Sequence, residues 1–167
     1  AIDIDAIIKK IHSFKCSLVE VTGGEPLIQQ ETPLLVYHLL ESGYEVMMET
    51  NGSLDISVVD DRCMKIVDIK CPSSKESDKN DLENLKRLNM KDQLKFVIGT
   101  RKDYEYAIEI VELIPTDFPG HHILFSPVYG EIQPSKIAEW ILEDKLDVRF
   151  HSQLHHMIWP NGEKKQL

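Results

Sequence analysis

The chain has few of the features that would place it at once in a large class of proteins. It has three cysteines among 167 residues, Cys16, Cys63 and Cys71, and they are widely scattered. An odd number of distant cysteines argues against a disulfide framework, and no CxxC spacing indicates a zinc site. No apolar run is long enough to span a bilayer, and the N-terminus lacks the pattern of a signal peptide. We therefore expect a cytoplasmic protein that does not enter a membrane.

Positive charge is also scarce. The chain has 19 Lys and Arg against 28 Asp and Glu, which gives a formal net charge of −9. No basic stripe could neutralise successive phosphates, so direct binding to nucleic acid is not expected. Apolar content of 42% and charged content of 28% are ordinary for a globular protein. Because the length suits one substantial core, the sequence predicts a single domain over residues 1–167.

What the chain does have is a regular alternation of helical and extended patterns. Apolar residues at helical spacing predict helices at 1–14, from the turn at Pro26 to about Ser42, at 77–89, at 103–113 and at 134–145. In the second of these, the expected buried face is Leu34, Leu35, His38 and Leu39, and the polar stretch 77–89 has only Leu82, Leu85 and Leu88 to dock it. Short apolar runs predict strands at 16–21, 44–50, 63–69, 93–99, 122–126 and 148–154. Alternation with short connections favours parallel strands with right-handed crossovers. The predicted fold is α/β, a partial (β/α) TIM-like barrel of parallel strands.

The expected strands end in small, polar or Gly/Pro residues. In the stretch VTGGEPL, Gly23 and Gly24 let the backbone turn and approach a ligand, and Glu25 can take a cationic group. Gly-Gly-x-Pro is also common in a plain turn between a strand and a helix. Since active sites of (β/α) barrels gather where the strands end, the agreement among the strand ends favours a ligand platform.

VTGGEPL resembles the Gly-Gly-Glu-Pro motif of radical S-adenosylmethionine (SAM) enzymes. Together with ETNGS, DIKCPSS, FSPV and QLHHMIWP, in this order, it is similar to the 7-carboxy-7-deazaguanine synthases, and the similarity runs from Val19 to Pro160. The resemblance implies a radical SAM lyase that converts 6-carboxy-5,6,7,8-tetrahydropterin to 7-carboxy-7-deazaguanine with loss of ammonia. This reaction would belong to queuosine biosynthesis, a tRNA modification pathway.

The resemblance also implies roles for individual residues. Thr22 and His155 would contact the pterin substrate, although His156 stands where the family pattern has lysine. No catalytic residue is expected within the chain. The residues implied to bind SAM are Gly24, Glu25, Cys71, Pro72, Ser73, Ser126, Pro127 and Val128.

Each of these roles has a structural alternative. Thr22 can be an ordinary strand residue of good β-propensity, and His155 can be a surface histidine. Ser73 and Ser126 can be helix caps or turn formers. Cys71 can be a small apolar residue whose backbone matters more than its sulfur.

The implied chemistry requires a [4Fe–4S] cluster held by three closely spaced cysteines, and the chain has no such triplet. By resemblance, the first barrel strand, the cluster loop and the ligand of a Mg²⁺ ion would precede Ala1. We therefore expect an N-terminally incomplete chain that is inactive alone. A flavodoxin-like or ferredoxin-like reductant and a homodimer are further expectations from the resemblance. Two alternatives remain, a radical SAM activating enzyme that acts on a partner protein and a SAM-binding module without a cluster.

Overall fold

The computed structural model describes residues 3–154 and 158–159, and the chain divides into two compact units. Unit 1 consists of Ala1–Asp68 and Lys79–Gln93, and unit 2 of Ile69–Asp78 and Leu94–Leu167. That the two units form one domain stays a prediction.

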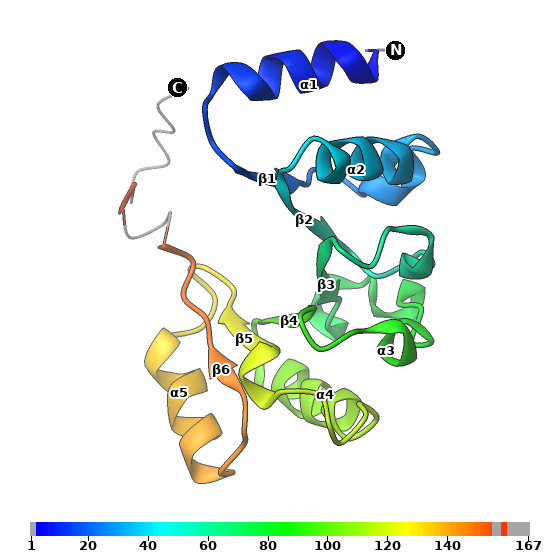
Figure 1. The fold of residues 1–167 in the computed structure, drawn as a ribbon. Helices are drawn as coiled ribbons and strands as arrows, with labels where there is room; N and C mark the ends of the chain where they lie inside the picture. Colours follow the sequence, from blue (N-terminus) through cyan, green and yellow to red (C-terminus); the bar gives the residue numbers. More distant parts are fainter. Residues whose placement is uncertain (1–2, 155–157, 160–167) are drawn as a thin grey trace. The chain divides into compact units, whose positions relative to one another are not determined.

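Unit 1 has a core of aliphatic side chains between parallel strands and α2. Its buried centre includes Val36, Leu39, Val46 and Met48, and Ile8 and other partly buried residues pack against it. Strands β1 and β2 pair in parallel, as do β2 and β3. The elements are α1 (Ile4–Ser13), β1 (Leu18–Val21), α2 (Thr32–Glu41), β2 (Glu45–Thr50), β3 (Met64–Ile69), which ends at the unit boundary, and α3 (Asn84–Arg87), all shown in Figure 1.

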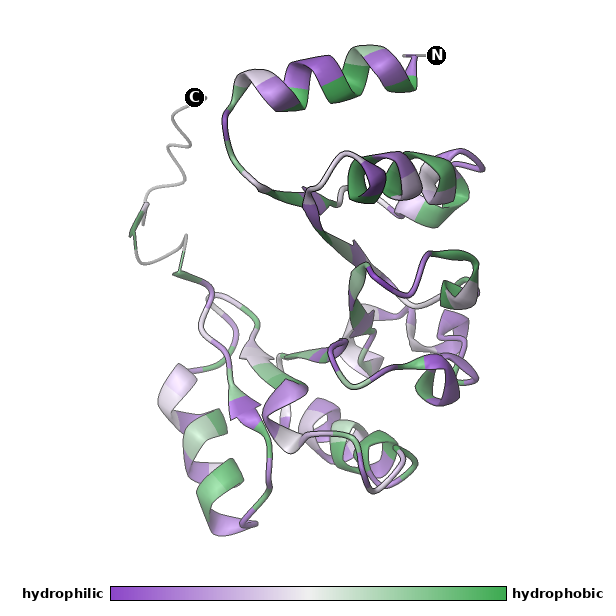
Figure 2. Cartoon of the chain, in the orientation of Figure 1, coloured by the Kyte–Doolittle hydropathy of each residue, from purple (hydrophilic) through white to green (hydrophobic). Residues whose placement is uncertain are grey.

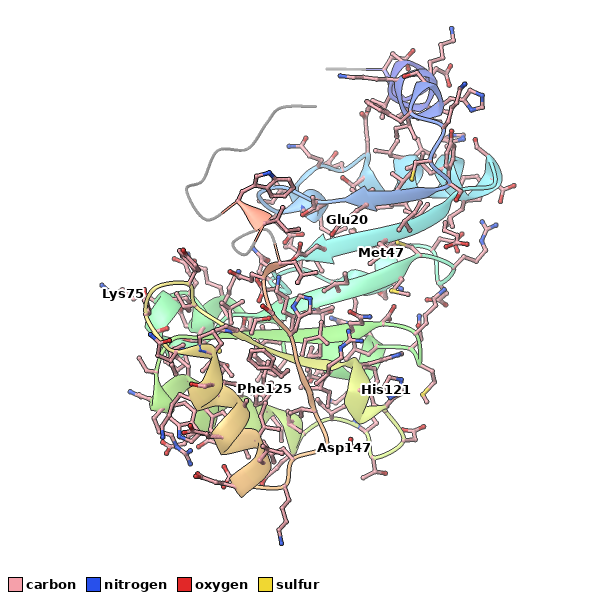
Figure 3. All side chains as sticks on the ribbon, turned by 90° about the vertical axis from the view of Figure 1, so that its left-hand side faces the viewer. Glu20, Met47, Lys75, His121, Phe125 and Asp147 are labelled. Atoms are coloured by element: carbon pink, nitrogen blue, oxygen red, sulfur yellow. The ribbon has the colours of Figure 1, made fainter. Side chains whose placement is uncertain are left out.

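Unit 2 has an aromatic core around Phe125, which Figure 3 labels. Every residue of β5 is buried, and the ring of Phe125 meets the rings of Phe96 and Tyr104 edge-to-face, with centroids 5.5 and 5.7 Å away. Strand β5 pairs in parallel with β4 and with β6. The elements are β4 (Gln93–Ile98), whose first residue belongs to unit 1, α4 (Arg101–Val111), β5 (Ile123–Pro127), α5 (Pro134–Glu143) and β6 (Arg149–Phe150).

The six strands have the order of the chain, β1-β2-β3-β4-β5-β6, in a parallel sheet that does not close among the described residues. The prediction of a partial (β/α) barrel of parallel strands is therefore confirmed. No helix in the described part of the chain is both long and apolar enough to cross a membrane.

Two predicted elements are wrong in extent. Residues 77–89 form only a 3₁₀ turn, Ser77–Lys79, and the short helix α3. The side chain of Asn84 explains this break, because it is buried and its amide donates to the carbonyls of Gly52 and Leu54 at 3.2 and 2.8 Å. This polar anchor takes the place of the apolar stripe that a longer helix would need. The strand predicted at 148–154 is limited to β6.

The inward face of α2 also differs from the prediction. We expected Leu34, Leu35, His38 and Leu39 to be buried, but the buried residues of α2 are Thr32, Val36 and Leu39, and Leu34 is 49% exposed. The hydroxyl of Thr32 donates to the carbonyl of Pro26 at 2.6 Å, which holds the start of the helix against the preceding turn. Figure 2 shows that polar and apolar residues alternate along α1, as expected for an amphipathic helix.

Candidate functional site

The turn after β1 leaves its backbone uncovered. Gly23 and Gly24 have φ of 101° and 54°, a region that residues with a Cβ rarely adopt. No atom lies within 4 Å of the position that a Cβ would take at either glycine. Thr22, predicted to contact the substrate, is exposed beside them. The turn therefore combines the required backbone conformation with room for a ligand.

Glu25 joins the end of β1 to the end of β2. It is 7% exposed, and its carboxylate accepts the hydroxyl of Thr50 at 2.8 and 2.9 Å. The backbone N–H groups of Asn51 and Leu27 donate to the same carboxylate at 2.7 and 3.0 Å. A carboxylate has about four acceptor positions, so these bonds occupy most of its capacity. A contact from Glu25 to the amino group of SAM stays a prediction.

A second buried carboxylate, Asp103, joins two segments of unit 2. Its Oδ1 accepts the N–H of Ser73 at 2.9 Å. Its Oδ2 accepts the N–H groups of Gly99 and Thr100 at 3.1 and 2.9 Å and the hydroxyl of Thr100 at 2.9 Å. Burial alone raises the pKa of Asp103, but the hydrogen bonds from Ser73, Thr100 and Gly99 outweigh burial and hold the pKa below its usual value. The carboxylate is therefore ionised, and hydrogen bonds within unit 2 occupy its acceptor positions.

Sequence reasoning missed Asp103. The available signal was the capping box that Thr100 and Asp103 form at the start of α4, with a Thr side chain followed three residues later by an acid. The bond from Asp103 to Ser73 has no local signal, because the two residues are 30 positions apart.

The segment Cys71-Pro72-Ser73 is a compact turn after β3. Cys71 is 2% exposed, and its carbonyl accepts the hydroxyl of Ser74 at 2.6 Å and the N–H of Ser74 at 3.0 Å. Lys75 follows with φ of 61°, in the left-handed region. The geometry agrees with Cys71 acting through its backbone, and SAM binding by this segment stays a prediction.

The segment Ser126-Pro127-Val128 ends β5. Ser126 is fully buried, and its hydroxyl lies 3.1 Å from Nδ1 of His151. The N–H of Val128 donates to the carbonyl of Ile98 at 2.9 Å, which extends the pairing with β4. Of the predicted SAM-binding residues, the structure therefore ties both unit 2 segments to the end of β4, one through Asp103 and the other through Val128.

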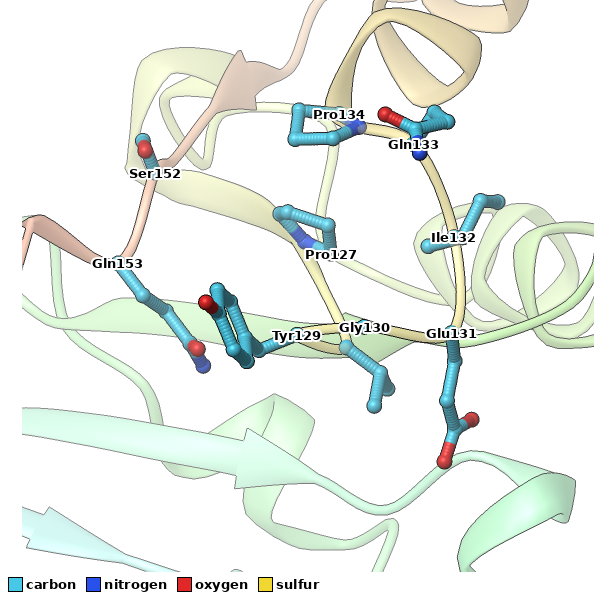
Figure 4. A pocket seen from close by; sticks show the side chains of 10 residues that line it. Pro127, Tyr129, Gly130, Glu131, Ile132, Gln133, Pro134, Ser152 and Gln153 are labelled. Atoms are coloured by element: carbon cyan, nitrogen blue, oxygen red, sulfur yellow. The ribbon is translucent and has the colours of Figure 1, made fainter. Parts of the chain in front are cut away.

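A pocket of about 620 Å³ opens beside Pro127 and Val128 (Figure 4). One side is the connection from β5 to α5, where Tyr129 lies, and the other side includes Ser152 and Gln153. Its volume falls within the range of about 300–1,000 Å³ that is typical of small-molecule sites. The pocket is therefore a concave site of suitable size for a ligand, and it lies beside a segment that is predicted to bind SAM.

Because Gly99 has no side chain, two residues of the pocket wall can lie close to its backbone. A Cβ at Gly99 would lie 2.7 Å from Oε2 of Glu131 and 3.3 Å from Cγ2 of Val128. Both residues line the pocket, so a larger residue at this position would displace them.

One face of the sheet in unit 1 carries carboxylates that sequence reasoning did not single out. Glu20 pairs in register with Met47, which Figure 3 also labels, and Glu49 lies two residues further along β2. The alternate residues Val46 and Met48 are buried in the core. Burial alternates along β2, but residue type does not alternate in EVMMET, so only VEV gave a local signal. The face opposite the core is therefore acidic.

His155, predicted to contact the substrate, lies outside the described residues, so its role stays a prediction.

No family model matches the chain. It is 39% identical over 155 residues to the 7-carboxy-7-deazaguanine synthase of Koribacter versatilis, an alignment that covers 85% of this chain and 69% of the relative. It is 38% identical over 168 residues to the 7-carboxy-7-deazaguanine synthase of Chlorobaculum tepidum, with 95% of this chain and 73% of the relative covered. The chain belongs to the 7-carboxy-7-deazaguanine synthase family.

Solved structures agree with this family at the level of the fold. The crystal structure of QueE from Escherichia coli matches with a TM-score of 0.72 at 20% identity, over 91% of this chain and 64% of QueE. The structure of Streptococcus suis SuiB bound to S-adenosylmethionine matches with a TM-score of 0.54 at 16% identity, over 90% of this chain and 42% of SuiB. This member of the synthase family thus spans about two thirds of the length of QueE.

The described residues of this 7-carboxy-7-deazaguanine synthase family member leave room for a ligand in each unit, but they do not fit an iron–sulfur cluster. In unit 1 the backbone at Gly23 and Gly24 is uncovered, and in unit 2 a pocket of small-molecule size lies beside Pro127. The cysteines do not form a cluster site: Cys16 is exposed, whereas Cys63 and Cys71 are buried. Burial raises the pKa of Cys63 to about 11, which disfavours the thiolate that iron requires. Among residues 3–154 and 158–159, no group of three His, Cys, Asp or Glu could hold a metal ion.

Proposed function

We propose that the protein is a 7-carboxy-7-deazaguanine synthase, a radical SAM lyase of queuosine biosynthesis. It would convert 6-carboxy-5,6,7,8-tetrahydropterin to 7-carboxy-7-deazaguanine with loss of ammonia. The observation that carries this proposal is the 39% identity to a relative of that name, of which the chain covers 69%. The open glycine turn and the pocket beside Pro127 support it.

The proposed roles follow the chemistry of the side chains. SAM, when bound, supplies the group that abstracts a hydrogen from the pterin. Gly24 would offer a bare N–H to the carboxylate of SAM, and Glu25 would face its ammonium group. The Cys71-Pro72-Ser73 and Ser126-Pro127-Val128 segments would bind the rest of SAM and exclude water from it. Thr22 and His155 would bind the pterin.

Further cofactors and partners belong to the same proposal. A [4Fe–4S] cluster and Mg²⁺ would complete the enzyme, and their ligands would lie upstream of Ala1, since the cysteines of the described residues do not fit a cluster. A flavodoxin-like or ferredoxin-like protein would be the reductant. The protein would act as a homodimer in the cytoplasm.

The test is anaerobic reconstitution of the longest natural form of the protein, followed by iron and sulfide analysis and by turnover of the carboxypterin with SAM. We expect about four irons per chain, as in a [4Fe–4S] cluster, and a product with the mass of 7-carboxy-7-deazaguanine. Iron without carboxypterin turnover would contradict the proposal and favour an activating enzyme that acts on a partner protein. SAM binding without iron would contradict it in favour of a binding module.

A further inference from the structure

The segment predicted to bind SAM after β3 is attached to the start of α4 through one carboxylate. Asp103 has no exposed surface and accepts the N–H of Ser73 with Oδ1 at 2.9 Å. Within the segment, the hydroxyl and N–H of Ser74 both donate to the carbonyl of Cys71. The turn is therefore closed by its own hydrogen bonds and attached to the rest of unit 2 at Asp103.

This anchor uses the backbone of Ser73 and leaves its side chain exposed. Because the ionised carboxylate of Asp103 accepts the N–H of Ser73, it fixes the backbone that carries the Ser73 hydroxyl. A hydroxyl can both accept and donate a hydrogen bond. A ribose hydroxyl, the ammonium or the adenine amino group of SAM could bind to it.

We propose that Asp103 is a positioning residue for SAM: it fixes the Cys71-Pro72-Ser73 segment and so holds the Ser73 hydroxyl in place for the ligand. This inference rests on the proposed function, because it requires that the segment binds SAM. Asp103 itself does not contact the ligand and acts through Ser73.

The substitution Asp103→Asn is expected to remove the anchor to Ser73 and to keep the helix cap. Oδ2 serves three donors from Gly99 and Thr100, whereas Oδ1 serves Ser73. The one oxygen of asparagine stays with the three donors, so its NH₂ group faces the N–H of Ser73 and the anchor is lost. On the reconstituted full-length protein, we expect the Kd for SAM to rise about tenfold, the loss of roughly one hydrogen bond to a charged group. Amide exchange in residues 71–76 should become faster.

Asp92→Asn is the matched control. Asp92 also has no exposed surface and accepts two backbone N–H groups, from Lys65 at 2.8 Å and from Asn89 at 2.9 Å, but it precedes β4 and lies in unit 1. We expect this variant to lose stability while its Kd for SAM stays within about twofold of the wild-type value.

Ser73→Ala tests the same inference without disturbing the cap, and it serves if Asp103→Asn does not fold. It should also raise the Kd for SAM about tenfold, and adding Asp103→Asn to it should have a smaller effect on binding than in the wild type. A wild-type Kd in either single variant would overturn the inference, as would equal loss of binding in Asp103→Asn and Asp92→Asn. A wild-type protein that does not bind SAM would instead overturn the proposed function, and the inference with it.

Discussion

Glu25 in unit 1 and Asp103 in unit 2 have the same structural role at two places in the chain. Each is a buried carboxylate that accepts one threonine hydroxyl and several backbone N–H groups where strands end. Glu25 joins the turn after β1 to the end of β2, whereas Asp103 joins the turn after β3 to the end of β4. Loops in both units are thus held by charge-assisted hydrogen bonds, which are the stronger kind.

The two carboxylates differ in what lies beside them. Next to Glu25 are two glycines with uncovered backbone, whereas Asp103 is enclosed by a helix cap and a compact serine turn. Under the proposed function, Glu25 would therefore serve both the loop and a ligand, whereas Asp103 would act on a ligand only through Ser73. Variants that remove each carboxylate measure how strongly each one holds its loop.

The largest effect is expected for Glu25→Ala. It leaves the hydroxyl of Thr50 and the N–H groups of Asn51 and Leu27 without their acceptor. We expect a loss of about 4 kcal/mol in the free energy of unfolding, since each buried donor left unsatisfied costs roughly 1–3 kcal/mol. Urea denaturation of the wild type and the variant measures this loss.

Thr50→Val is its control, because it removes the hydroxyl that donates to Glu25 and accepts a long bond from the N–H of Gly52 at 3.3 Å, while it keeps the shape of a side chain that is 1% exposed. This variant should lose only about 1 kcal/mol. Equal losses in the two variants would mean that Thr50, and not the carboxylate, holds the two strand ends together.

Asp103→Asn should have the next largest effect, about 2 kcal/mol near neutral pH, and this effect should depend on pH. The pKa of Asp103 is held low in the folded protein, so its ionised form stabilises the fold. The stabilisation is complete above the unfolded pKa of about 3.9 and is lost as pH falls through the lower folded pKa. The difference in Tm between the wild type and the variant should therefore be constant above about pH 5 and shrink below about pH 4. A difference that stays the same down to pH 3 would contradict the assignment of an ionised Asp103.

The comparison of the two carboxylates also shows what the sequence could predict. The glycine turn and Glu25 stand within the seven consecutive residues of VTGGEPL, so local chemistry was enough to single them out. Alternation of patterns with short connections likewise predicted parallel strands in chain order. Asp103 acts on a residue 30 positions away, and nothing in its neighbourhood indicates that partner.

The errors in element boundaries have the same origin. Asn84 bonds to carbonyls more than 25 residues away, at Gly52 and Leu54, and this tertiary anchor replaces a helix that local polarity and three leucines had indicated. The buried face of α2 was misassigned because Thr32 is buried through the bond of its hydroxyl to Pro26, which the spacing of apolar residues does not indicate. Polar side chains that bond at long range are therefore what local patterns missed.

A smaller effect is expected at Tyr104, which anchors α4 one residue beyond Asp103. Its hydroxyl donates to Asp144 at 2.9 Å, while its ring packs in the aromatic core of unit 2. Tyr104→Phe keeps the ring and should cost about 1 kcal/mol, the net value of one hydrogen bond. Thermal unfolding and SAM binding should be measured together, since we expect a lower Tm and an unchanged Kd. A weaker Kd would mean that any loosening of α4 disturbs the ligand segment, and that Asp103 has no special role.

The smallest effect is expected at Lys75, which directly follows the turn that Asp103 anchors. Its φ of 61° is costly for a residue with a Cβ, by about 1–2 kcal/mol. Lys75→Gly removes this cost but gives the unfolded chain more freedom, so we expect a net gain of about 0.5 kcal/mol in the free energy of unfolding. Lys145→Gly, at φ of 52° after α5, is the matched control and should gain a similar amount. If Lys75→Gly alone destabilised the protein, the lysine side chain would have a contact that offsets its backbone strain, and the turn would be held from both ends.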